Sequence, residues 1–144
     1  MKTVQDVLKQ KGSQIHSVSP DTTVFDTLKL MAEKEIGAVL VFQGDRMVGI
    51  FSERDYARQV ILKGKASKDT PVKEVMTARV AYVRPEQTVD DCMALMTDKK
   101  IRHLPVVVEG NVAGVLSIGD VVKAVISEKQ FLIEQLENYI TSGG

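Results

Sequence analysis

The stretch 49-GIFSERD-55 decides the fold, because the chain repeats its pattern as 114-GVLSIGD-120. Each copy begins with glycine, continues through two large apolar residues and ends in Ser-x-x-Asp. The pattern predicts a strand that turns into a helix, whose first N–H groups lack intrahelical partners and carry a partial positive charge. Such a turn suits a phosphate or a sugar, since the aspartate accepts hydrogen bonds from neighbouring hydroxyls.

Ser-x-x-Asp also has a purely structural interpretation. It is the pattern of a capping box, which starts a helix and binds nothing. For a single copy the capping box is the favoured interpretation. The duplication shifts the balance towards a pair of binding sites.

The repeat extends well beyond this motif. Residues 18–61 align with residues 83–126 without a gap at a shift of 65. A repeat of about sixty residues predicts two similar halves that pack on each other. The pattern also continues upstream, where one triplet has the spacing of another: Val4, Val7 and Leu8 against Val72, Val75 and Met76.

Each copy reads as short helix, strand, helix, strand, strand, helix. Thr23 and Thr88 are predicted N-caps, and Gly37 is predicted to end the first long helix in a left-handed conformation. Two short apolar runs around a glycine-containing turn then predict a hairpin in each copy. The helices after Ser52 and Ser117 are predicted to turn one apolar face inward, formed by Ala57, Val60 and Ile61, and by Val122, Val125 and Ile126.

Composition and charge exclude several classes of protein. Lys plus Arg and Asp plus Glu both number 19, so no electrostatic footprint for nucleic acid or anionic membrane is present. No apolar run reaches the length of about eighteen residues that a membrane span needs. The single Cys92 predicts a buried apolar residue in a reducing compartment, and we expect a cytoplasmic protein.

The boundaries follow from the repeat. We assign residues 1–65 to the first copy, 66–71 to a linker and 72–126 to the second copy. Residues 127–144 form an amphipathic tail with an apolar stripe at helical spacing. The favoured interpretation is a helix that docks back on its own fold, and the alternative is a helix that binds a partner or braces a dimer. The stripe comprises Phe131, Leu132, Leu136, Tyr139 and Ile140.

The duplicated motif, together with 101-IRHLPVV-107 and 75-VMT-77, resembles the cystathionine-β-synthase (CBS) domain pair over residues 1–126. The resemblance implies an α+β (mixed α/β) fold of two pseudo-symmetric β-α-β-β-α repeats, packed sheet to sheet with two clefts between them, and here a C-terminal helix is added. It implies a homodimer and adenosine-containing ligands: AMP, ADP, ATP, NAD or S-adenosylmethionine. Their occupancy would be passed to an enzyme or transporter that the sequence does not identify.

The resemblance also implies the site residues. Ser52, Asp55, Ser117 and Asp120 would bind ribose. Adenine would lie in an apolar slot at the strand starts, where Pro105 would leave a carbonyl free. The slot comprises Ile15, Ile36, Gly37, Ala38, Thr77, Val80, Ile101, His103, Leu104 and Pro105. Phosphate would be bound by Arg54 and Arg58 in the first unit and by Arg79, Arg102, His103 and Gly119 in the second.

Several of these residues have a second interpretation. Arg54 and Arg58 also fit a solvated helix face, and His103 also fits the core. The two sites differ, because Glu53-Arg54 becomes Ile118-Gly119 in the second copy. Gly119 lets a bulky ligand come close to the second site. We therefore expect the two sites to bind different ligands. NAD is the leading candidate for a ligand longer than AMP.

No catalytic motif or metal-ligand spacing is present, so we expect a protein that is not an enzyme and holds neither a metal nor a catalytic cofactor. AMP, NAD or both would be regulatory ligands. One alternative is a dimerisation scaffold with clefts that do not function. Another is a small nucleotide-processing enzyme.

Overall fold

The chain folds into two compact units. The computed structural model describes residues 1–143, with side chains placed for residues 1–138. One unit is continuous and comprises Ile15–Ala81. The other is discontinuous and joins Met1–Gln14 to the chain from Tyr82 onward. We call them the continuous and the discontinuous unit.

The continuous unit contains a three-stranded sheet in the order β1-β2-β3. β1 is parallel to β2, and β2 is antiparallel to β3. Its strands are β1 (Ser17–Val18), β2 (Ala38–Gln43) and β3 (Arg46–Ser52). Its helices are α2 (Val24–Lys34), α3 (Glu53–Asp55), the π-helix η1 (Tyr56–Ile61) and the 3₁₀-helix η2 (Val72–Glu74).

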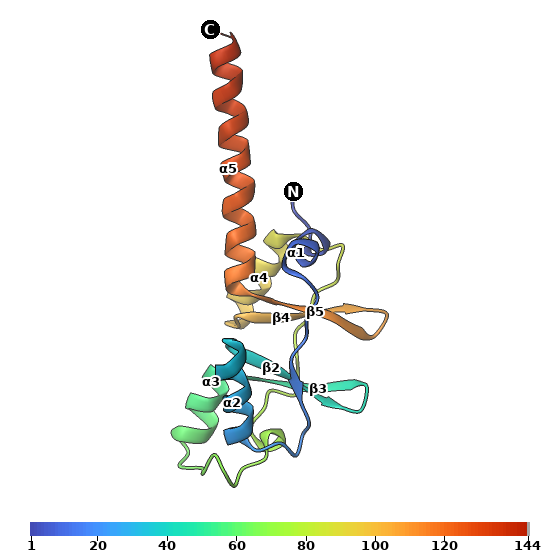
Figure 1. Cartoon of the computed structure of the whole chain (residues 1–144), viewed down its shortest axis with the longest axis vertical. Helices are drawn as coiled ribbons and strands as arrows, with labels where there is room; N and C mark the ends of the chain where they lie inside the picture. Colours follow the sequence, from blue (N-terminus) through green and yellow to red (C-terminus); the bar gives the residue numbers. More distant parts are fainter. Residues whose placement is uncertain (144) are drawn as a thin grey trace. The chain divides into compact units, whose positions relative to one another are not determined.

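The discontinuous unit repeats this topology around the hairpin β4–β5 (Figure 1). Val83 forms a parallel bridge to Val106, in the position that β1 holds in the other unit. The elements are α1 (Val4–Lys11), α4 (Val89–Lys99), β4 (His103–Val108), β5 (Asn111–Ser117) and α5 (Ile118–Gly143). The predicted α+β class and the order of elements are therefore confirmed.

If the gap-free stretches 18–61 and 83–126 are taken as the two copies, the segment upstream of each copy packs against the other copy. Before the first copy, the Val4 N–H donates to the Gln87 carbonyl at 2.8 Å, which ties α1 into the discontinuous unit. Before the second copy, the Thr70 carbonyl accepts from the Val24 N–H at 2.8 Å in the continuous unit. Each packed unit thus combines parts of both sequence copies, an exchange that we call the segment crossing.

The crossing explains the glycine that opens each repeated motif. A Cβ added to Gly114 would lie 2.7 Å from Leu8 Cδ2, and one added to Gly49 would lie 2.9 Å from Met76 Cγ. Both distances are shorter than real Cβ contacts, so the two glycines let the crossing segment approach the hairpin. Leu8 and Met76 are the residues whose spacing matches upstream of the two copies.

The helix caps agree with prediction at one end only. Thr23 and Thr88 cap α2 and α4 by accepting from the backbone N–H three residues on. The predicted role of Gly37 is wrong, because Glu35 is the residue in the left-handed conformation, with φ 54°. The Ile36 N–H then donates to the Met31 carbonyl at 3.0 Å, which closes the helix before Gly37 is reached.

The hairpin turns lie where the sequence predicts them. Gly44 has φ 63°, and Glu109 and Gly110 have φ 50° and 83°. In the second hairpin, positive φ at both central residues gives the turn whose twist matches that of the flanking strands. In the first hairpin, Gly44 is the one of the two central residues with positive φ. The hairpins bury Val39, Leu40, Val41 and Phe51 in the continuous unit, and Leu104, Val106 and Leu116 in the discontinuous unit.

The inner faces of the last helices were predicted only in part. In η1, Val60 is buried but Ile61 is 55 % exposed, because π-type hydrogen bonding breaks the spacing of a regular α-helix. In α5, the buried residues are Val121 and Ala124 rather than Val122 and Ile126. Val121 and Val122 are adjacent and both apolar, so helical periodicity alone does not show which of them faces the core.

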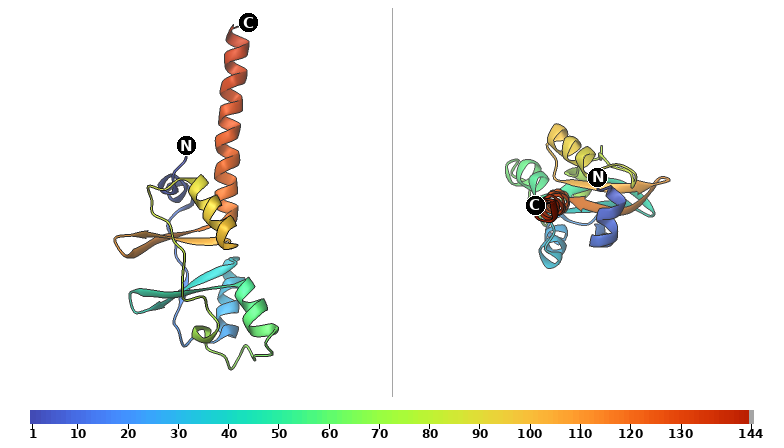
Figure 2. Two further views of the ribbon diagram at one scale, coloured as in Figure 1. Left: turned by 180° about the vertical axis from the view of Figure 1, so that it is seen from behind. Right: turned by 90° about the horizontal axis from the view of Figure 1, so that it is seen from above.

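The C-terminal tail does not dock back on the fold. The first turns of α5 contact α1 and α4 (Figure 2), but its later apolar side chains are exposed. The prediction of a docked tail is therefore wrong for Phe131, Leu132 and Leu136. The side chains of Tyr139 and Ile140 lie outside the described residues. No helix within the described part of the chain is long and apolar enough to cross a membrane.

Candidate functional site

In the continuous unit, the turn after β3 is a complete capping box. The Asp55 N–H donates to Ser52 Oγ at 3.2 Å, and the Ser52 N–H donates to Asp55 Oδ2 at 2.9 Å. The Glu53 N–H donates to the Gly37 carbonyl at 3.0 Å, which joins the turn to the start of β2. The sheet register also pairs Ser52 with Ala38. The motif and the predicted slot at 37–38 are thus brought together.

Thr77 completes this turn from the crossing segment. Its backbone pairs with that of Ile50 through two hydrogen bonds of 2.9 Å. Its hydroxyl donates to Asp55 Oδ1 at 3.1 Å. The Asp55 carboxylate is therefore held on both oxygens, by the capping box and by a neutral hydroxyl.

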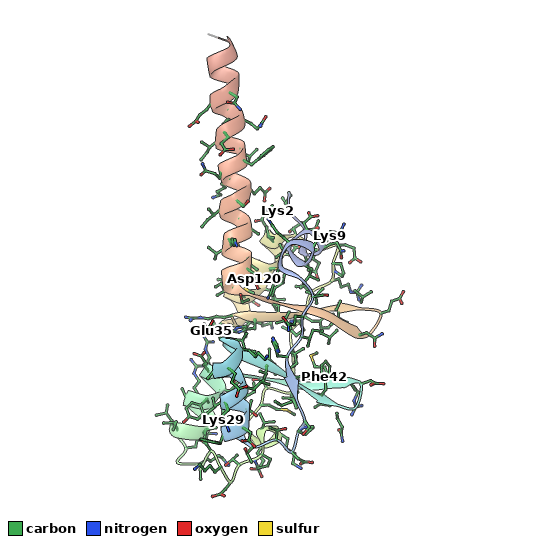
Figure 3. The ribbon with its side chains drawn as sticks, viewed as in Figure 1. Lys2, Lys9, Lys29, Glu35, Phe42 and Asp120 are labelled. Atoms are coloured by element: carbon green, nitrogen blue, oxygen red, sulfur yellow. The ribbon has the colours of Figure 1, made fainter. Side chains whose placement is uncertain are left out.

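In the discontinuous unit, the same capping box forms at the start of α5, where Figure 3 labels Asp120. The Ser117 N–H and Oγ donate to Asp120 Oδ2 at 2.8 and 3.0 Å. The Ile118 N–H donates to the Arg102 carbonyl at 2.8 Å, as the Glu53 N–H does to Gly37. Ser117 pairs with His103 across the hairpin.

Lys11 is the partner of Asp120 in this second turn. Its ammonium lies 2.5 Å from Asp120 Oδ2 and donates to the Val115 carbonyl at 2.6 Å. Burial alone would raise the pKa of Asp120. The hydrogen bonds from Lys11 and Ser117 and the charge of Lys11 outweigh burial, and they hold the pKa below its ordinary value. Both side chains stay reachable from solvent, at 35 % exposed for Lys11 and 24 % for Asp120.

His103 lies half-buried at the start of β4. Burial lowers the pKa of its imidazole, and the positive charges of Lys11 and Arg102 act in the same direction against the opposing charge of Asp120. The neutral ring is therefore favoured, with one nitrogen able to accept a hydrogen bond. The equivalent position of the continuous unit is Ala38, which offers no polar side-chain atom.

The other predicted slot residues differ in what they can offer. Leu104 is fully buried, so only its backbone could meet a ligand. The carbonyl of Pro105 itself accepts from the Val83 N–H at 3.0 Å, because Val83 pairs with β4. A free carbonyl beside Pro105 therefore stays a prediction. The half-buried slot residues are Ile15, Ile36, Gly37, Val80 and Ile101.

The predicted phosphate ligands are divided between the two units. Arg58, Arg79, Arg102 and Gly119 are exposed, and Arg54 is half-buried. Arg79 was assigned to the second unit, yet it lies in the continuous unit with Ser52 and Asp55. The crossing is the reason for this correction, because the Thr77–Ile50 pairing carries residues 72–81 to the first hairpin.

Lys11 was not found from the sequence. The spacing match of Leu8 with Met76 marks the segment, but a repeat does not reveal that each segment crosses to the other copy. Only the crossing brings Lys11 to a motif more than a hundred residues later. Among the described residues, no group of three or more His, Cys, Asp or Glu side chains could hold a metal ion.

Comparison with known proteins identifies this architecture. A family model described as CBS domain matches twice, at residues 4–61 and 72–127. The chain is 39 % identical to the mitochondrial CBS domain-containing protein CBSX3 of Arabidopsis thaliana, over 98 % of this chain and 73 % of that protein. It is 31 % identical to the CBS domain-containing protein YhcV of Bacillus subtilis, over 83 % of each.

Solved structures agree. A CBS-domain protein from Burkholderia ambifaria is 52 % identical, with a TM-score of 0.85, over 88 % of this chain and 95 % of that one. The CBS-domain structure NE2398 is 49 % identical with a TM-score of 0.84, over 87 % of this chain and 98 % of that one. The resemblance deduced from the duplicated motif is therefore confirmed.

Proposed function

Because this chain belongs to the CBS-domain family, we propose that it is a regulatory module that binds adenosine-containing nucleotides and passes their occupancy to another protein. The observation that carries the proposal is the pair of Ser-x-x-Asp turns. Each turn holds a carboxylate at a helix start, beside the first residues of a strand. We assign ribose binding to Ser52, Asp55, Ser117 and Asp120.

The chemistry of the two turns supports this assignment. A carboxylate has only acceptor lone pairs, so it suits the two hydroxyls of a ribose. Asp120 is partly exposed, and its depressed pKa keeps it ionised at neutral pH. Neighbouring cations would meet the phosphates of AMP or NAD. We assign this role to Arg54, Arg58, Arg79 and Arg102, while the neutral ring of His103 would donate one N–H to a phosphate oxygen and Gly119 would give backbone access.

The slot for adenine is part of the same proposal. Backbone at the starts of β2 and β4 lies beside each turn through the contacts of Gly37 with Glu53 and of Arg102 with Ile118. The half-buried apolar residues nearby would cover the two faces of the base. Leu104 and Pro105 would contribute through their backbone, and Thr77 through its place beside Asp55.

We propose that the protein regulates without catalysis, as a cytoplasmic homodimer. The curated relatives with matching length are described only as CBS domain-containing proteins. The exposed apolar side chains of α5 support an association with a second copy. Light scattering of the purified chain tests the dimer, and fractionation of the native cells tests the location.

Thermal melts test ligand binding. The panel is AMP, ADP, ATP, NAD, NADH and S-adenosylmethionine, with the chain first freed of any ligand it carries. A ligand at a hundred times its dissociation constant stabilises the folded state by about 2.7 kcal/mol, which raises the melting temperature by several degrees. Asp55→Ala and Asp120→Ala should each reduce this shift.

Asp91→Ala is the matched control. Asp91 forms the same capping box with Thr88 at the start of α4, so its loss has the same structural effect at a helix away from the hairpin turns. This variant should keep the full ligand shift, although it loses about 1 kcal/mol of stability. If no adenine nucleotide at millimolar concentration raises the melting temperature, the protein is better described by the alternative of a dimerisation scaffold. Turnover of a nucleotide during incubation would favour the enzyme.

A further inference from the structure

We infer that Lys11 makes the Ser117–Asp120 turn selective for phosphorylated ligands over neutral nucleosides. The inference rests on the proposed function, since it concerns what the ribose carboxylate of that turn accepts. It assigns a specificity-determining role to a residue that lies outside both repeated motifs, on the last turn of α1.

The contacts of Lys11 define what a ligand meets. Its ammonium is bonded to Asp120 Oδ2 and to the Val115 carbonyl, and an ammonium has three donors. Asp120 Oδ2 also accepts from Ser117, so the oxygen that closes the capping box is the one that Lys11 neutralises. The third Lys11 donor is left for a group that enters from solvent.

The ligand's charge decides how this arrangement responds. The hydroxyls of a neutral ribose must donate to a carboxylate whose charge is already balanced by an ammonium. A neutral nucleoside also offers Lys11 no charged partner if the contact between Lys11 and Asp120 loosens. A phosphate offers the ammonium a new charge-assisted partner while the hydroxyls take the carboxylate. The same lysine therefore weakens nucleoside binding and strengthens nucleotide binding.

The other turn provides the internal contrast. There, Asp55 receives its second contact from the Thr77 hydroxyl, which is neutral. The motif serine of the first turn, Ser52, pairs across the hairpin with Ala38, whereas Ser117 of the second turn pairs with His103. Burial lowers the pKa of His103 and so favours its neutral ring. The direct contact of the Lys11 ammonium with the carboxylate is therefore what distinguishes the second turn.

The experiment measures adenosine and AMP binding by calorimetry, using the full chain with Asp55→Ala to weaken the first turn. We expect this chain to prefer AMP by at least about tenfold. Adding Lys11→Met should tighten adenosine, weaken AMP and bring the ratio below about threefold. Lys11→Arg, which keeps the charge, should restore most of the preference for AMP.

Lys9→Met is the matched control, because it removes the same charge from the same last turn of α1, at a side chain next to Asp6 rather than Asp120, and should leave the ratio unchanged. An unchanged ratio in Lys11→Met, or an equal weakening of both ligands, overturns the inference while the proposed function stands. If neither adenosine nor AMP binds the unaltered chain, the proposed function fails and this inference fails with it.

Discussion

Asp120 combines a structural and a chemical role in one side chain. It closes the capping box of α5 and is paired with Lys11, so one carboxylate oxygen accepts three hydrogen bonds. Asp55 has the same cap but a neutral additional partner. The local contacts therefore differ where the two motifs look alike.

The Lys11–Asp120 pair predicts a pH-dependent contribution to stability. The folded-state pKa of Asp120 is depressed, so the stabilisation is present above the unfolded value of 3.8 and is lost as pH falls through the folded value. Urea unfolding of Lys11→Met, Asp120→Asn and the double variant should give a coupling free energy of about 0.5–1 kcal/mol near neutral pH.

That coupling should shrink progressively as the pH is lowered from neutral to well below 3.8 and the carboxyl becomes protonated. A coupling equally large at both pH values would contradict the assignment of the pKa shift to this pair. Lys9→Met combined with Asp120→Asn is the control, and it should give no coupling at either pH.

Cys92 provides a second prediction at this scale. Its thiol is fully buried in α4, and burial raises its pKa to about 11, with the charge of Asp91 adding to the effect. Because the thiolate is the reactive form, the native protein should not react with a thiol reagent near pH 8, whereas the urea-unfolded chain should react at once. Rapid labelling of the native protein would show that α4 opens locally.

At the scale of the element, the glycine of each motif is set by the crossing segment. Gly114→Ala should destabilise the protein by about 1–3 kcal/mol, because the new methyl group overlaps Leu8. Gly49→Ala should be milder, since methionine adjusts more readily than leucine. Thermal unfolding of both variants measures the difference.

Shortening the side chain of Leu8 tests whether its overlap with the new methyl group causes the destabilisation by Gly114→Ala. Leu8→Ala opens a cavity when made alone, but it also removes the atom that a Cβ on Gly114 would meet. The two substitutions together should therefore be less destabilising than the sum of the single changes. Simple additivity would mean that Gly114 is needed for another reason.

The elements also show which features the sequence could predict. Thr23, Thr88 and the hairpin turns follow local rules, so residue type and spacing are enough. The end of α2 was misplaced because Glu35 adopts a conformation that its residue type does not favour. The inward face of α5 was misplaced because Val121 and Val122 are equally apolar, and only contacts with α1 and α4 choose between them.

At the scale of the whole molecule, the duplicated turns could be predicted, but their partners could not. A repeat reports that two segments are alike and does not report which hairpin each one joins. Lys11 and Thr77 reach Asp120 and Asp55 only through the segment crossing. The partners of the two aspartates are set by contacts between segments far apart in the chain, and residue patterns do not reveal such contacts.

The crossing predicts how fragments of the chain behave. Residues 1–65 and 66–144 each contain one motif, but each lacks the segment that covers its own hairpin. Neither fragment should fold alone, whereas an equimolar mixture should recover the circular dichroism spectrum of the intact chain. Cuts between residues 14 and 15 and between 81 and 82 follow the packed units, and the fragment 15–81 that they release serves as the comparison, because it keeps the segment that covers its own hairpin.

The reciprocal exchange of segments has a consequence for how such a protein can change over time. A simple tandem duplication can discard one copy and keep a working half. Here α1 serves the later hairpin and residues 70–77 serve the earlier one, so deleting either copy damages both halves at once. Neither half can therefore be lost without the other. The positions at which the two copies can differ most easily are the side chains that line each turn.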